Sequence, residues 1–122
     1  MGSHDPEVTI YHNPRCSKSR QTLQLLREHG LEPRIVEYLK TPPDRDTLRS
    51  LLHLLGLRPR ELMRTRERLY TELALNDPGR SDDALIDAMV EHPILIERPI
   101  VLRGGDRAAL GRPPEQVLEI LE

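Results

Sequence analysis

The sequence predicts an α/β fold built on a mixed four-stranded sheet, with a block of helices inserted in the middle of the chain. Three observations support this prediction. A strand–helix–strand pattern occupies residues 8–39, helical patterns without strands follow over about residues 44–92, and two strands joined by a glycine-rich turn precede the last helix. We assign residues 7–122 to one domain, because a chain of this length buries a hydrophobic core without disulfides.

The first strand–helix–strand unit begins with an apolar strand over residues 8–12. An Asn-Pro turn follows, and leucines that recur on one face predict a helix from Ser17 to Gly30, a residue suited to a helix end. Residues 34–39 predict a second strand. A connection of this kind is a right-handed crossover, so the two strands should pair in parallel.

The middle of the chain is expected to hold several short helices. Thr41 is expected to cap the first, with proline in its first turn, and Gly56 to end it. A short helix follows Pro59, another covers residues 69–73, and Ser81 caps the last. The residues expected to face the core from the first and last of these helices are Leu48, Leu51, Leu52, Leu55, Leu85, Ile86, Met89 and Val90.

The C-terminal part predicts strands over residues 100–103 and 107–111, joined by a Gly-Gly-Asp hairpin turn. A final helix then packs Val117, Leu118 and Leu121 against the sheet. The complete order of elements is that of a thioredoxin-like, or glutaredoxin-like, α/β fold with an inserted helical block.

Composition excludes several classes of function. A net charge of −2 and the absence of Phe and Trp argue against nucleic-acid binding, and no apolar run is long enough to span a membrane. A single cysteine excludes an internal disulfide and suits the cytoplasm. Residues 1–6 are expected to be a tag remnant or a disordered N-terminus, since Met1-Gly2-Ser3-His4 resembles an expression tag.

Cys16 stands where the first strand gives way to the first helix. A thiol at a helix N-terminus feels the positive end of the helix dipole and the unpaired N–H groups there, which favour the thiolate. The alternative is that Cys16 is a small apolar residue buried in the core. The polar neighbours Ser17, Lys18, Ser19 and Arg20 disfavour that alternative, so the sequence predicts a reactive cysteine.

Most of the other candidate residues are expected to have no chemical role. His29, His53 and His92 lack the spacing of metal ligands, and we expect neither a metal site nor a tightly bound cofactor. Arginine is by far the commoner cation, and Arg60 and Arg66 are examples expected to be solvated surface charges.

The segment HNPRCSKSR, which begins at His12, resembles the active-site loop of the glutaredoxin- and glutathione-dependent arsenate reductase (ArsC-like) family. Residues 60–64, 91–100 and 110–115 resemble three further stretches of that family in the same order. The resemblance therefore covers nearly the whole chain. It implies the thioredoxin-like fold with a helical insertion and the reduction of arsenate to arsenite.

The resemblance also implies roles for particular residues. Cys16 would be the nucleophile that attacks arsenate, and His12 would help to poise its thiol. Arg64, Arg98 and Arg112 would hold the oxyanion and the covalent arsenic intermediates. The position of Pro99 resembles the cis-proline that faces the cysteine in thioredoxin-like sites.

The implied mechanism needs external thiols. A thiol–arsenate adduct on Cys16 would be attacked by glutathione, and glutaredoxin would resolve the mixed disulfide. The sequence independently supports external donors, because no second cysteine exists and Ser19 stands where a dithiol motif would have one. Thr22 excludes the Cys-x5-Arg loop of the phosphatase-like reductases. The expected partners are arsenate, glutathione and glutaredoxin, and the expected state is a cytoplasmic monomer.

Two alternatives remain. The protein could be a glutathione-linked thiol–disulfide oxidoreductase of the same fold that acts on another substrate. It could also be a redox-sensing regulator that binds RNA polymerase. The three arginines disfavour the first, since thiol exchange needs no oxyanion clamp, and the lack of a Cys-x-x-Cys pair disfavours the second.

Overall fold

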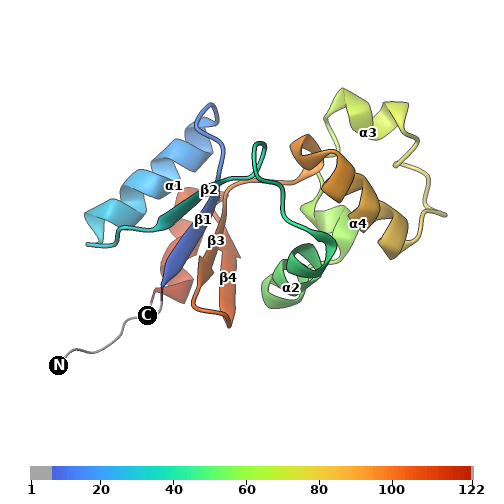
Figure 1. Ribbon diagram of the computed structural model, residues 1–122. Helices are drawn as coiled ribbons and strands as arrows, with labels where there is room; N and C mark the ends of the chain where they lie inside the picture. Colours follow the sequence, from blue (N-terminus) through green and yellow to red (C-terminus); the bar gives the residue numbers. More distant parts are fainter. Residues whose placement is uncertain (1–6, 122) are drawn as a thin grey trace. The chain divides into compact units, whose positions relative to one another are not determined.

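A computed structural model describes residues 7–121 of the chain (Figure 1), so the predicted tag remnant at residues 1–6 lies outside the described residues. The chain divides into two units. One runs up to Glu37 and resumes at Arg98, and the other comprises Tyr38–Glu97. We call them the sheet unit and the helical unit. The range 44–92, expected to be an inserted helical block, lies within the helical unit.

Among its described residues, the sheet unit has four strands in the order β2-β1-β3-β4. The central strand β1 (Val8–His12) pairs in parallel with β2 (Arg34–Glu37) and antiparallel with β3 (Ile100–Arg103), which pairs antiparallel with β4 (Arg107–Leu110). The predicted mixed four-stranded sheet and its parallel crossover are therefore confirmed.

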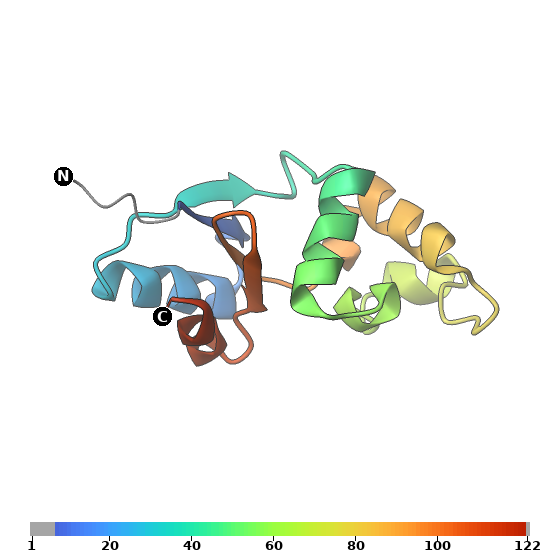
Figure 2. The ribbon, with the colours of Figure 1, turned by 90° about the horizontal axis from the view of Figure 1, so that it is seen from below.

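Two helical elements lie side by side along one face of this sheet (Figure 2): α1 (Ser17–Glu28) and η3 (Pro114–Ile120). The core between the sheet and these two helical elements is formed by alternate residues of the strands and by apolar residues of α1 and η3. Its buried members are Val8, Ile10, Leu26, Val101, Ala109, Val117 and Ile120.

The last element differs from the predicted helix, because η3 is a 3₁₀-helix. Three residues per turn place side chains three positions apart on one face, so the buried residues are Pro114, Val117 and Ile120. Leu118 and Leu121, expected in the core, are only half-buried.

The helical unit contains five elements, of which α4 packs against three others. In chain order they are α2 (Arg45–Leu55), η1 (Pro59–Leu62), α3 (Arg68–Glu72), α4 (Asp82–Glu91) and η2 (Pro93–Leu95). Gly56 ends α2 with a φ of 67°, a left-handed conformation that suits glycine. Most predicted core residues are buried, but Leu55 and Val90 are half-buried.

The predicted cap of α2 at Thr41 is wrong. Asp44 is the N-cap, and its carboxylate accepts a hydrogen bond from the N–H of Thr47 at 2.8 Å. A residue that precedes proline is kept out of the helical region, so Pro42, which precedes Pro43, cannot form the first helical turn. The helix therefore begins after the two prolines.

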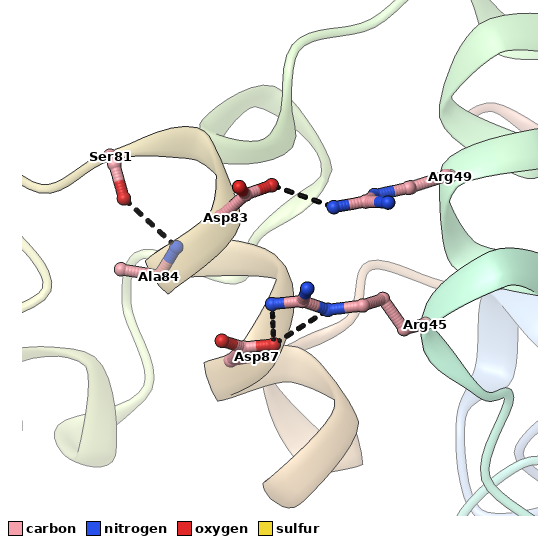
Figure 3. Close-up of polar contacts among 6 residues, drawn as sticks. All are labelled: Arg45, Arg49, Ser81, Asp83, Ala84 and Asp87. Carbon is pink, nitrogen blue, oxygen red and sulfur yellow. Dashed lines mark hydrogen bonds and ion pairs between the residues drawn. The ribbon is translucent and has the colours of Figure 1, made fainter.

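Ion pairs join the facing surfaces of α2 and α4 (Figure 3). Arg49 pairs with Asp83 at 2.8 Å and Arg45 pairs with Asp87, while Ser81 caps α4 as predicted. These side chains are exposed, and such pairs contribute at most about 1 kcal/mol each. The buried leucines and methionine between the two helices therefore provide most of their packing energy.

Arg60 is another correction, because it is half-buried rather than a solvated surface charge. Its guanidinium donates to the hydroxyl of Tyr70 and to the carbonyls of Leu75 and Asp77. It thus stabilises the backbone that follows α3.

Gly111 gives a test of the sheet unit's packing. Its N–H donates to the carbonyl of Pro99 at 2.9 Å, and an added Cβ would lie 2.8 Å from Cγ of Pro99 and against the side chain of Thr22. We expect Gly111→Ala to lower the free energy of unfolding by about 1–3 kcal/mol, measured by urea denaturation. Gly105→Ala is the control, since nothing lies within 4 Å of its added Cβ. Equal stability of the two variants would contradict the packing described.

Candidate active site

Cys16 is the N-cap residue of α1, in an extended backbone conformation with φ −95° and ψ 124°. Its N–H donates to the carbonyl of Asn13, and its carbonyl accepts from the N–H of Arg20, each at 3.0 Å. The Asn-Pro turn and the first turn of the helix therefore fix the backbone on both sides of the thiol. The side chain is partly exposed, so a small reactant can reach the sulfur.

Three groups favour ionisation of the Cys16 thiol. They are the guanidinium of Arg98, through hydrogen bonding and positive charge, and the backbone of Ser19 and of Lys18 in the first turn of α1, through hydrogen bonding. Burial by itself would raise the pKa of the Cys16 thiol, but these hydrogen bonds and the positive charge of Arg98 outweigh burial and lower the pKa. The arrangement therefore favours the thiolate.

His12 lies at the end of β1, buried beside the same turn. Its Nδ1 is 2.7 Å from Oγ of Ser19, which also accepts the N–H of Asn13 at 3.0 Å. Burial is the main reason that the pKa of His12 is lowered. The carboxylate of Glu37 opposes that shift and nearby arginines reinforce it, so the imidazole is neutral near pH 7.

Ser19 connects His12 with the thiol, and the sequence analysis assigned it no role. Its hydroxyl binds His12 and its N–H faces the sulfur of Cys16, while its side chain is completely buried. The position of Ser19, three residues after the N-cap, could have indicated this contact, because side chains at that position commonly hydrogen-bond the turn before a helix.

Arg98 and Arg112 flank the hairpin of β3 and β4, and each precedes a proline. The Arg98–Pro99 peptide bond is cis, as the resemblance implies, and the Arg112–Pro113 bond is cis as well. Nη1 of Arg112 donates to the carbonyl of Arg98 at 3.2 Å. The sheet unit therefore contains Cys16, Arg98 and Arg112, and within it Arg112 contacts the backbone of Arg98.

Arg64 belongs to the helical unit, where it follows η1. Its guanidinium pairs with the carboxylates of Glu67 and Glu97. The structure therefore places two of the three predicted arginines in the unit that holds the thiol, and the third in the other unit.

Within residues 7–121, no cluster of three or more His, Cys, Asp or Glu side chains could hold a metal ion. None of the helices described in that range has the length and apolar character needed to cross a bilayer.

Comparison with known proteins identifies the family to which this chain is similar. The family model described as the ArsC family matches residues 11–120. The uncharacterized protein YfgD of Escherichia coli is 61% identical to this chain, with 94% of this chain and 97% of that protein covered. An arsenate reductase of Neisseria meningitidis is 50% identical, and the match covers 95% of this chain and 99% of that protein.

A solved structure of an arsenate reductase from Vibrio cholerae is 55% identical to this chain. It superposes with a TM-score of 0.93 over 97% of this chain and 100% of that one. The predicted thioredoxin-like fold with a helical insertion is thereby confirmed. Because the family model and relatives above 50% identity span nearly all of the chain, this protein belongs to the ArsC family.

Proposed function

We propose that this protein reduces arsenate to arsenite, with Cys16 as the nucleophile and with glutathione and glutaredoxin as external thiol donors. The observation that carries the proposal is the partly exposed thiol at the N-terminus of α1, whose pKa is lowered by hydrogen bonding and positive charge from Arg98. Relatives named arsenate reductases at about 50% identity support the choice of substrate.

Arginine suits the first step for an electrostatic reason. Near neutral pH arsenate is an anion, and a thiolate that approaches it meets like-charge repulsion. Fixed guanidinium groups offset that repulsion and orient the oxygens of the substrate. In this proposal Arg98 first stabilises the thiolate and then, with Arg112 and Arg64, stabilises the charge that accumulates on arsenate.

The electrons come from two thiols. The sulfur of Cys16 bonds to arsenic as one arsenate oxygen leaves as water. A glutathione thiolate then attacks the sulfur of Cys16 to form a mixed disulfide, and the As–S bonding pair leaves with arsenic as arsenite. A glutaredoxin thiol attacks the glutathione sulfur and releases the Cys16 thiolate. Because this chain has one cysteine, the second and third thiols are external.

His12 acts through Ser19 in this proposal. A neutral imidazole hydrogen-bonded to the Ser19 hydroxyl holds the first turn of α1, whose N–H groups face the thiolate. His12 is therefore a positioning residue. We extend the proposal to a monomer in the cytoplasm. A single unpaired thiol suits that reducing compartment.

The turnover assay follows arsenate-dependent NADPH oxidation in the presence of glutathione, glutaredoxin and glutathione reductase. We expect Cys16→Ser to abolish turnover and Arg64→Ala to lower kcat/KM about 10- to 100-fold, the loss expected for a charge-assisted hydrogen bond. Arg66→Ala, an exposed neighbour in the same segment, should retain activity. Full activity of Cys16→Ser would contradict the proposal, and disulfide exchange without arsenate turnover would favour the thiol–disulfide oxidoreductase.

The ionisation of Cys16 can be measured without arsenate. The rate of alkylation by iodoacetamide follows the thiolate fraction, so its midpoint should lie at a lower pH than that of an unperturbed cysteine. Arg98→Ala removes a hydrogen bond and a positive charge from the sulfur, and the midpoint should rise. Arg34→Ala, an exposed change on β2, should leave it in place. A midpoint unchanged by Arg98→Ala would show that Arg98 does not stabilise the thiolate.

A further inference from the structure

Two exposed cationic residues flank Cys16 along the chain. Arg15 directly precedes the cysteine, and Lys18 lies in the first turn of α1, two residues after it. Cys16 itself is partly exposed, so a reactant reaches its sulfur through the solvent that also surrounds these two side chains. All three residues belong to the sheet unit.

Hydrogen bonds hold the backbone of both residues close to the thiol. The N–H of Arg15 donates to Oδ1 of Asn13 at 3.0 Å, within the turn that leads to Cys16. The carbonyl of Lys18 accepts from the hydroxyl of Thr22 at 2.8 Å, within α1. Both charged side chains therefore extend from fixed positions beside the nucleophile.

Neither charge is neutralised by a contact. Within residues 7–121, no hydrogen bond or ion pair joins the side chain of Arg15 or Lys18 to another residue. Arg20 differs, because its guanidinium donates to the carbonyl of Pro14 at 2.9 Å. The sequence from residue 8 to residue 27 also contains no Asp or Glu. The positive charge beside the thiol is therefore available to a reactant.

The stability of α1 does not explain a cation at position 18. The positive end of the helix dipole favours acidic residues in the first turn and disfavours cations there. The helices α2 and α4 follow that preference with Asp46, Asp82 and Asp83, whereas α1 has no acidic residue in its first turn. A role in the reaction of the neighbouring thiol accounts for Lys18 better than helix formation does.

We propose that Arg15 and Lys18 make Cys16 selective, by charge, for small anionic thiols and disulfides as its reaction partners. Glutathione belongs to this class, because its two carboxylates outnumber its one ammonium group. The inference deepens the proposed function and rests on it in one respect, namely that glutathione is the thiol donor.

Exposed cations of this kind act through their electric field rather than through a fixed contact. The field raises the concentration of anions near the sulfur and so the rate of encounter, and it has the opposite effect on cations. Dissolved salt screens the field over about 10 Å at 0.1 M ionic strength. The effect should therefore depend on charge and on salt, and little on whether the cation is arginine or lysine.

The test measures how fast reduced Cys16 reacts with three disulfides of different charge. They are glutathione disulfide, which is anionic, bis(2-hydroxyethyl) disulfide, which is neutral, and cystamine, which is cationic. In each reaction the Cys16 thiolate attacks one sulfur, the S–S bond breaks and one thiolate leaves, so a mixed disulfide forms that mass spectrometry can follow. A change in the ionised fraction of Cys16 alters all three rates by the same factor, so each rate is divided by that of the neutral disulfide.

We expect Arg15→Gln and Lys18→Gln each to lower the relative rate with glutathione disulfide about two- to threefold at low ionic strength. The double variant should lower it about five- to tenfold. The relative rate with cystamine should rise in the same variants, and every difference should shrink as salt is added. Arg15→Lys and Lys18→Arg keep the charge and should retain the relative rates of the parent.

Arg34→Gln is the matched control. It removes the same charge from an exposed residue of β2, which pairs with Thr9 at the opposite end of β1 from His12, and it should leave the relative rates unchanged. Unchanged relative rates in the double variant, an equal loss in Arg34→Gln, or a loss with cystamine that matches the loss with glutathione disulfide would each overturn the inference. The proposed function fails separately, by the absence of arsenate turnover in the parent.

Discussion

The chemistry proposed for this protein depends on the effect of Arg98 on the thiol of Cys16, because hydrogen bonding and positive charge from Arg98 lower the pKa of that thiol. Burial of the thiol opposes ionisation, while Arg98 and the first N–H groups of α1 favour it more strongly. The same donors can then stabilise an oxyanion. A site of this kind needs the cysteine at the start of a helix and an arginine brought to it from a distant part of the chain.

The fold holds Arg98 in place through the hairpin that follows it. Arg112 donates to the carbonyl of Arg98, and the N–H of Gly111 donates to the carbonyl of Pro99. The space beside Pro99 and Thr22 leaves no room for a side chain at position 111. The hairpin, the cis-proline segment and α1 are thus packed against one another.

Local patterns in the sequence were sufficient for the strands, the parallel crossover and the position of Cys16 at the start of a helix, because each depends on neighbouring residues. The cap at Thr41 was wrong because two consecutive prolines delay the helix until after Asp44. Pairings between distant residues could not be read from spacing. The contact of Cys16 with Arg98 was expected only from family resemblance, and the pairing of Arg64 with Glu97 depends on a bridge that no local pattern reveals.

In the proposed reaction, electrons pass from glutathione to arsenic through the sulfur atom of Cys16. The most direct measurement is mass spectrometry of the peptide that contains Cys16, after the reduced protein has been incubated with arsenate and one equivalent of glutathione, without glutaredoxin. The account predicts a glutathione mixed disulfide on Cys16 that forms only with arsenate and matches the arsenite released. Arsenite release with Cys16 unmodified, or the same disulfide formed equally fast without arsenate, would contradict it.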